Sequence, residues 1–233
     1  LSLHDALPIC ADGTDPDTGT GEVDTGTCSD RAGTDTGKVD TGTGSDEAGT
    51  DSECSLALAI NEIDYDNEGP DTAEFVEIFN SGNCPYPLGG VSLVFFNGND
   101  MLEYRRVALS EAGETLAPGQ FLLVAGQGVA APTGVPVIAL PEGAIQNGPD
   151  GIALLDLDDF ALLDAFCWEG ELAEVYMDDI LEPISLLQGE LATAKDTSTA
   201  PLSLYRFPDG ANTGDAATDW FAGLPSPGLP NTL

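Results

Sequence analysis

The chain has 233 residues and a formal net charge of −35, from 41 acidic and 6 basic side chains. Affinity for nucleic acids and anionic lipid comes largely from lysine and arginine, so this charge argues against both classes of partner. It favours a soluble surface that attracts cations. The single histidine, His4, leaves the rest of the chain without the base of a catalytic triad or a histidine ligand for zinc.

The first nine residues, LSLHDALPI, match one translated frame of a widely used short-read sequencing adapter. We therefore interpret residues 1–9 as an assembly artefact and expect the natural N-terminus and its signal peptide to be missing. The alternative is the end of a signal peptide followed by a lipoprotein cysteine, Cys10. The sequence LPIC fits that alternative poorly, because small residues are preferred just before such a cysteine. A lipid anchor in the missing N-terminus stays open as a mode of attachment.

Residues 10–54 are rich in Asp, Thr and Gly. Residues 11–53 contain no Leu, Ile, Phe, Tyr or Trp, so they have too little apolar surface to offset the entropy of ordering. Two consecutive 16-residue units, GEVDTGTCSDRAGTDT and GKVDTGTGSDEAGTDS, agree at 12 positions but have no apolar face that could stack. We expect a disordered, self-repelling linker that holds a domain away from a surface.

Residues 55–233 show short apolar runs separated by turn residues, at intervals of 8 to 15 residues. This spacing predicts an all-β fold, an antiparallel sandwich or barrel. The sequence allows a short helix only within residues 171–193, where Pro183 would interrupt it. No run approaches the length of a membrane-spanning segment. We predict strands near residues 56–64, 73–80, 88–96, 103–109, 120–125, 136–140, 151–156, 162–168 and 202–206.

The acidic loop between the first two predicted strands is the main candidate for a metal site. Calcium prefers oxygen ligands, and the stretch DYDNEG resembles the opening of an EF-hand loop. Phe75 stands where that loop would need its bidentate Glu. The candidate ligands are Asp64, Asp66, Glu68 and Asp71. A weaker group in a predicted hairpin turn consists of Asp156, Asp158 and Asp159. For both groups the alternative is a solvated turn in which Asp and Asn bond their own backbone.

The same predicted hairpin brings two cysteines together. If Ile63 lies opposite Phe75, paired positions sum to 138, and Cys54 and Cys84 sum to 138 as well. We therefore predict a disulfide between Cys54 and Cys84, with two free thiols as the alternative. Cys167 lies in an apolar run and is predicted to be a small buried side chain.

Six stretches in order carry a family resemblance: AINEIDYD (59–66), AEFVEIFN (73–80), LGGVSLV (88–94), LAPGQFLLVAG (116–126), IQNGPDGIALLD (145–156) and LLDAFCWEG (162–170). Together they resemble the lamin tail domain family, an immunoglobulin-like β-sandwich. SLYRFPDGANTGDAATDW (203–220) and PSPGLPN (225–231) resemble the closing segment of bacterial secreted members, so the resemblance spans about residues 56–231. The resemblance implies a non-enzymatic module for protein or surface interactions, with no catalytic or cofactor residues to transfer.

We therefore expect residues 55–233 to be a non-catalytic extracellular or cell-surface interaction module on an acidic flexible stalk. Its partner would be an unknown protein or surface ligand, with no nucleic acid, no transmembrane segment and no cofactor other than Ca²⁺. Two alternatives stay open: the accessory domain of a truncated secreted hydrolase of nuclease or phosphatase type, and a calcium-dependent adhesion domain. A carboxylate-only hydrolase is the one enzyme class that the sequence leaves, because two acids suffice for it.

Overall fold

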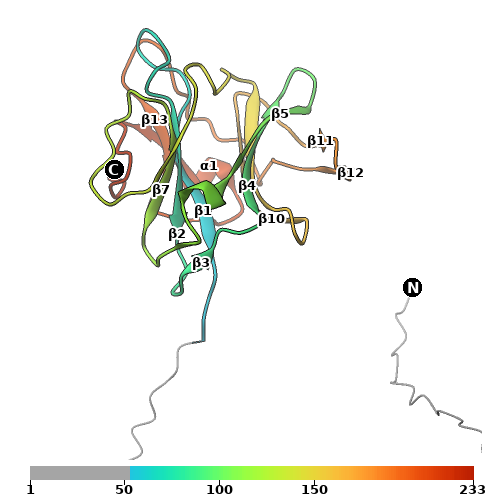
Figure 1. The fold of residues 1–233 in the computed structure, drawn as a ribbon. Coiled ribbons are helices and arrows are strands. Elements are labelled where there is room, and N and C mark those ends of the chain that lie inside the picture. Colours follow the sequence, from blue (N-terminus) through green and yellow to red (C-terminus); the bar gives the residue numbers. More distant parts are fainter. Residues whose placement is uncertain (1–52) are drawn as a thin grey trace, which may run out of the picture. The chain divides into compact units, whose positions relative to one another are not determined.

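The computed structural model describes residues 53–233, which form two six-stranded β-sheets packed face to face (Figure 1). The all-β sandwich predicted from the sequence is confirmed. The expected artefact at residues 1–9 lies outside the described residues, as does all but the end of the expected linker at residues 10–54.

The strands follow the predicted runs closely, and all nine predicted strands are present. In order across the first sheet lie β14 (Trp220–Gly223), β13 (Ser203–Arg206), β1 (Leu58–Asp64), β2 (Phe75–Asn80), β7 (Phe121–Ala125) and β8 (Val137–Ala139). The second sheet runs β10 (Ala161–Trp168), β9 (Asp150–Asp156), β4 (Val91–Asn97), β5 (Leu102–Ala108), β11 (Val175–Met177) and β12 (Ile180–Ile184). The remaining elements are β3 (Tyr86–Pro87) paired with β6 (Thr115–Leu116), a 3-10 turn at Leu109–Ala112 and the single-turn helix α1 (Ala216–Asp219). Neighbouring strands are antiparallel except for the pairs β7–β8 and β5–β11.

The core between the sheets is built from alternate side chains of each strand. On β4, Leu93 and Phe95 join the main core, whereas Val94 and Phe96 belong to a second apolar cluster. Residues 172–191 supply the other side of that second cluster. Both faces of β4 are buried, which explains why its sequence is a nearly continuous apolar run.

The helix considered for residues 171–193 is wrong, because this segment forms the antiparallel hairpin β11–β12. Val175 and Met177 are buried in the second apolar cluster, while Tyr176 between them is exposed. That alternation is the period of a strand, not of a helix. Pro183 is tolerated because β12 is the outermost strand, where no neighbour requires its missing N–H. No helix in residues 53–233 has both the length and the apolar character needed to cross a bilayer.

The predicted pairing of Ile63 with Phe75 is also wrong, by one residue. Ile60 pairs with Ile78 as expected, but a bulge at Asn61 shifts the ladder so that Ile63 faces Val76. A bulge inserts one extra residue into one strand, so the register differs on its two sides. The Asn61 side chain contributes to this geometry by bonding Glu77 Oε1 at 2.8 Å and accepting from the Gly210 N–H at 2.8 Å. The half of the hairpin nearer the cysteines keeps the predicted register.

Candidate interaction edge

The outer edge of β5 is the feature best suited to contact another chain. β5 pairs with β4 along its whole length, but β11 meets it at one position only, Leu102 opposite Tyr176. The contact is anchored by Tyr176 N donating to Met101 O at 2.9 Å. Beyond it the two strands diverge, so residues 104–108 have no strand on their outer side. Unpaired strand edges present a row of backbone donors and acceptors to any approaching chain.

A cavity of about 560 Å³ lies where β5 and β11 separate. Figure 1 shows β11 and β12 standing away from the body of the sandwich beside β5. The floor of the cavity is β5, and its opposite wall is β11 with the turn that follows. Its lining residues are Leu102, Glu103, Tyr104, Arg105, Arg106, Tyr176, Asp178 and Asp179.

Arg106 closes the far end of this cavity by joining β5 to the hairpin turn. Its guanidinium donates to Glu103 at 2.6 and 2.9 Å and to Asp179 at 2.8 and 3.0 Å. The hydrogen bonds from Arg106 lower the pKa of the Asp179 carboxyl. The side chains of Arg106 and Asp179 are 29% and 51% exposed, however, and exposed ion pairs of this kind contribute only about 0.2–1 kcal/mol. The hairpin turn is therefore held to β5 by a weak link.

The four carboxylates predicted to bind calcium do not converge. Asp66 accepts from Ser198 N at 2.9 Å and from the Asn147 side chain at 3.3 Å, and Asp71 accepts from Asn67 N at 3.2 Å. Glu68 is exposed. Within residues 53–233 the structure brings together no group of three or more His, Cys, Asp or Glu side chains that could hold a metal ion.

Asp64 belongs instead to a buried pair with Asp196, a residue that the sequence did not single out. Asp196 accepts from Tyr65 N at 2.9 Å and Asp66 N at 3.2 Å, which places it beneath the loop. Burial and the neighbouring Asp196 raise the pKa of Asp64 to about 8, so the pair retains a proton at neutral pH. Two carboxyls this close cannot both ionise cheaply. No local pattern marks Asp196, because it lies about 130 residues further along the chain.

The weaker predicted group forms the turn between β9 and β10. Asp156 Oδ1 accepts from Asp158 N at 3.0 Å and from Asp159 N at 3.4 Å. This is a side chain bonding the backbone of its own turn, the alternative stated for this group. Asp158 and Asp159 are exposed.

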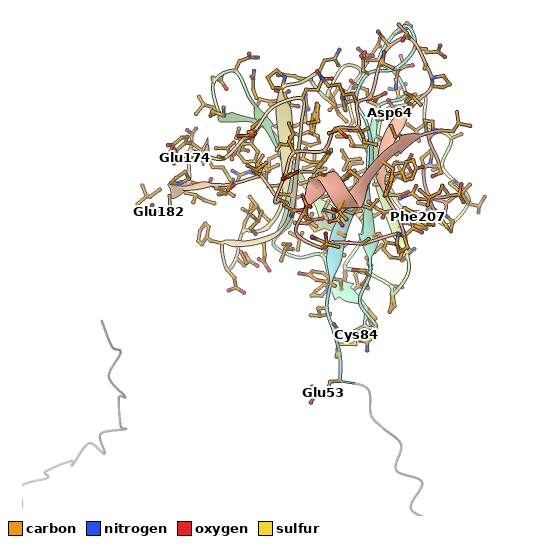
Figure 2. All side chains as sticks on the ribbon, turned by 180° about the vertical axis from the view of Figure 1, so that it is seen from behind. Glu53, Asp64, Cys84, Glu174, Glu182 and Phe207 are labelled. Atoms are coloured by element: carbon orange, nitrogen blue, oxygen red, sulfur yellow. A yellow bond between two sulfur atoms is a disulfide. The ribbon has the colours of Figure 1, made fainter. Side chains whose placement is uncertain are left out.

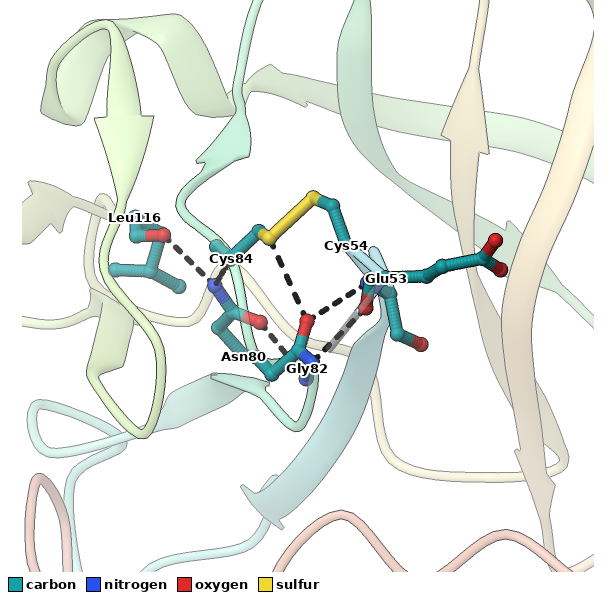
Figure 3. Close-up of a disulfide and its surroundings, with 8 residues drawn as sticks. Glu53, Cys54, Asn80, Gly82, Cys84 and Leu116 are labelled. Carbon is teal, nitrogen blue, oxygen red and sulfur yellow. Dashed lines mark hydrogen bonds between the residues drawn. A yellow bond between two sulfur atoms is a disulfide. The ribbon is translucent and has the colours of Figure 1, made fainter. Parts of the chain in front are cut away.

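A disulfide joins Cys54 to Cys84 at the end of the β1–β2 hairpin, with a Cα–Cα distance of 5.7 Å (Figure 3). The turn beside it is fixed by Asn80, whose side chain donates to Cys84 O at 2.9 Å and to Leu116 O at 2.8 Å. Cys167 is a free, buried cysteine in the second apolar cluster.

A buried arginine, Arg206, links the two sheets, and no sequence pattern indicated its role. Arg206 on β13 bonds Asp164 on β10 at 3.0 Å and Asp219 of α1 at 3.2 Å, with all three side chains 0 to 2% exposed. It also donates to Ile60 O at 2.9 Å and lies 4.9 Å from the ring centre of Trp220. A buried charge is tolerated only when paired and fully hydrogen-bonded, so these contacts depend on one another.

Two buried glutamates face each other across β1 and β2. Glu62 pairs with Glu77 in the ladder, and both are fully buried. The C-terminal segment covers them: Ser226 N donates to Glu62 at 2.9 Å and Gly228 N to Glu77 at 2.6 Å. Burial raises the pKa of Glu77 to about 8 and raises that of Glu62 as well.

Two packed sheets with predominantly antiparallel pairing form a β-sandwich of the immunoglobulin-like class. The family model of the Lamin Tail Domain matches residues 53–170, and the chain belongs to this family. Members are immunoglobulin-like modules that generally act in protein interaction. The matched part ends shortly after β10, yet β13 and β14 beyond it complete the first sheet. No curated protein matches the chain.

Proposed function

We propose that this protein is a non-catalytic interaction module that works outside the cytoplasm, at the cell surface or in the extracellular medium. The observation that carries the proposal is the disulfide between Cys54 and Cys84. Disulfides persist in oxidising compartments and are rare in the cytosol, which supports an exported domain.

The acidic segment before the domain supports the same proposal. Its Asp, Thr and Gly composition is typical of an extended linker, so the domain would be presented at a distance from its anchor. The disulfide lies where this segment meets the sandwich. The family adds protein interaction as the general activity.

The proposal is tested by locating the protein in its source cells and reading the redox state of its cysteines. Intact cells are treated with a membrane-impermeant amine label, and thiols are then blocked by an alkylating reagent before lysis. We expect the protein to be labelled, with the Cys84 peptide alkylated only after reduction. A Cys54→Ser/Cys84→Ser variant provides the control for the disulfide readout. Recovery of unlabelled protein with Cys84 alkylated before reduction would overturn the proposal.

A further inference from the structure

We propose that residues 104–108 of β5 accept an extended, lysine- or arginine-bearing segment of a partner protein as an additional strand. The β11–β12 hairpin would lie beside that segment as a clasp. This inference rests on the proposed function as an interaction module and names the kind of partner it recognises.

The first argument comes from the backbone. In the second sheet, the outermost strand β12 is protected against pairing with another chain, whereas β5 is not. β12 carries Pro183, which cannot donate a backbone hydrogen bond and so discourages pairing on that strand. Residues 104–108 contain no proline and have β4 on one side, and residues 104–106 line the cavity on the other. An extended peptide that adds to such an edge gains affinity from main-chain hydrogen bonds.

Charge decides which kind of segment fits. Arg106 is already matched by Glu103 and Asp179, and Arg105 donates to Ala144 O at 3.3 Å. The acidic side chains that line the cavity are Glu103, Asp178 and Asp179, and Glu174 and Glu182 lie on or directly beside the strands of the hairpin. Within residues 53–233, the side chains of Asp178 and Glu182 make no hydrogen bond or ion pair. Figure 2 shows Glu174 and Glu182 at the outer rim of the hairpin.

A basic segment complements this border, whereas an acidic one is repelled by it and by the charge of the whole chain. The same reasoning argues against the chain's own residues 10–54 as the occupant, because that segment is itself strongly acidic. The occupant is therefore assigned to another protein.

Exposed apolar side chains add a second requirement for the partner. Leu102 is 50% exposed, Tyr176 is 42% exposed and Leu181 is 97% exposed. Leu102 and Tyr176 line the cavity itself. Successive side chains of a strand point to opposite faces, so the fitting segment alternates basic and apolar residues.

The weak ion pair between Arg106 and Asp179 allows the turn of the β11–β12 hairpin to move relative to β5. Both partners are partly exposed, so water replaces the bond readily when the turn moves. Movement of the turn widens the space along residues 104–108 without disturbing the pairing of β5 with β4. The open end of the hairpin stays anchored because Val175, which pairs with Ile184 there, is fully buried.

The test uses a capped peptide in which lysine alternates with valine and threonine. Two control peptides have glutamate in place of lysine, or the same composition with the lysines grouped at one end. Binding is measured by fluorescence anisotropy, and the site is mapped on the isotope-labelled full-length protein by amide chemical shifts. We expect the alternating peptide to bind, with the largest shifts and new exchange protection in residues 104–108.

Charge-reversed turns provide the matched variants. Asp178→Lys/Asp179→Lys should weaken binding by about tenfold, the size expected for the loss of two exposed charge contacts. Asp158→Lys/Asp159→Lys makes the same change in net charge on the β9–β10 turn and should leave the affinity within about twofold. Thermal melting confirms that both variants are folded.

Three outcomes would overturn the inference: no binding by the alternating peptide, equal weakening in both variants, or shifts centred away from β5. None of them bears on where the protein is located, so a failure here is distinguishable from a failure of the proposed function.

Discussion

Replacing Arg206 by methionine should be among the most damaging single substitutions in this domain. The change removes the cation from between Asp164 and Asp219 and the donor to Ile60 O, all of them buried. Removal of one partner of a buried ion pair typically costs about 3–5 kcal/mol, because the other charge is left without compensation. For a domain of this size, a loss of about 4 kcal/mol lowers Tm by roughly 8–16 °C.

Urea denaturation followed by the fluorescence of Trp168 and Trp220 measures this loss of free energy of unfolding. Arg106→Met is the matched control, because Arg106 also bonds two carboxylates at similar distances but is partly exposed. We expect the control to lose less than about 1 kcal/mol. Equal losses in the two variants would refute the reasoning that burial sets the cost.

A double-mutant cycle separates the contribution of the Arg206–Asp164 ion pair to the free energy of unfolding from the contribution of the packing of the arginine side chain. Asp164→Asn should cost less in the Arg206→Met background than in the unmodified protein, because the amide no longer leaves a buried charge unpaired. Additive losses would mean that the Arg206→Met effect comes from lost packing. The cation–π contact with Trp220 would then be the first feature to test.

Three further predictions concern pH, the disulfide and calcium. The pKa values of Glu77 and Asp64 are raised to about 8, so these groups add stability at acidic pH that is lost as pH rises from about 4 to about 8. Thermal melting should therefore show Tm falling over that range, with a smaller fall in Glu77→Gln; a Tm that rises with pH would contradict this. Cys54→Ser/Cys84→Ser should lose on the order of 3 kcal/mol of stability in urea, and intact-mass measurement of the unmodified protein should gain 2 Da on reduction, as a single disulfide requires. The Tm measured in millimolar Ca²⁺ should equal the Tm measured in chelator, because Asp64, Asp66 and Asp71 already have protein partners. A clear rise of Tm in Ca²⁺ would support the calcium-binding alternative.

The strand positions were predictable because each strand carries its own apolar alternation or continuous run. Leu93 and Phe95 could be placed in a strand without knowing their partners. The bulge at Asn61 could not be predicted from the sequence, because it depends on contacts of the Asn61 side chain with Gly210 and Asp209 in a distant turn. The predicted register was therefore right only on the side of the bulge nearer Cys54.

The interaction edge was harder to anticipate than the fold. Residues 171–193 contain enough apolar residues for a short helix, and only the outer face of the second sheet explains why they form a hairpin instead. Tertiary burial of Val175 and Met177 overrides the local preference. Arg106 also lies in an unremarkable strand sequence, and its role depends on Asp179, which is 73 residues away.

The disulfide also has a mechanical consequence for a domain held by its N-terminal side. Tension that enters at Cys54 passes directly to Cys84 and bypasses β1 and β2, which lie between them in sequence. The bypassed segment of about 30 residues would otherwise release about 100 Å of chain when extended. The chain between the two cysteines thus cannot be extended while the bond is intact, and a reducing environment would turn a stiff attachment into an extensible one.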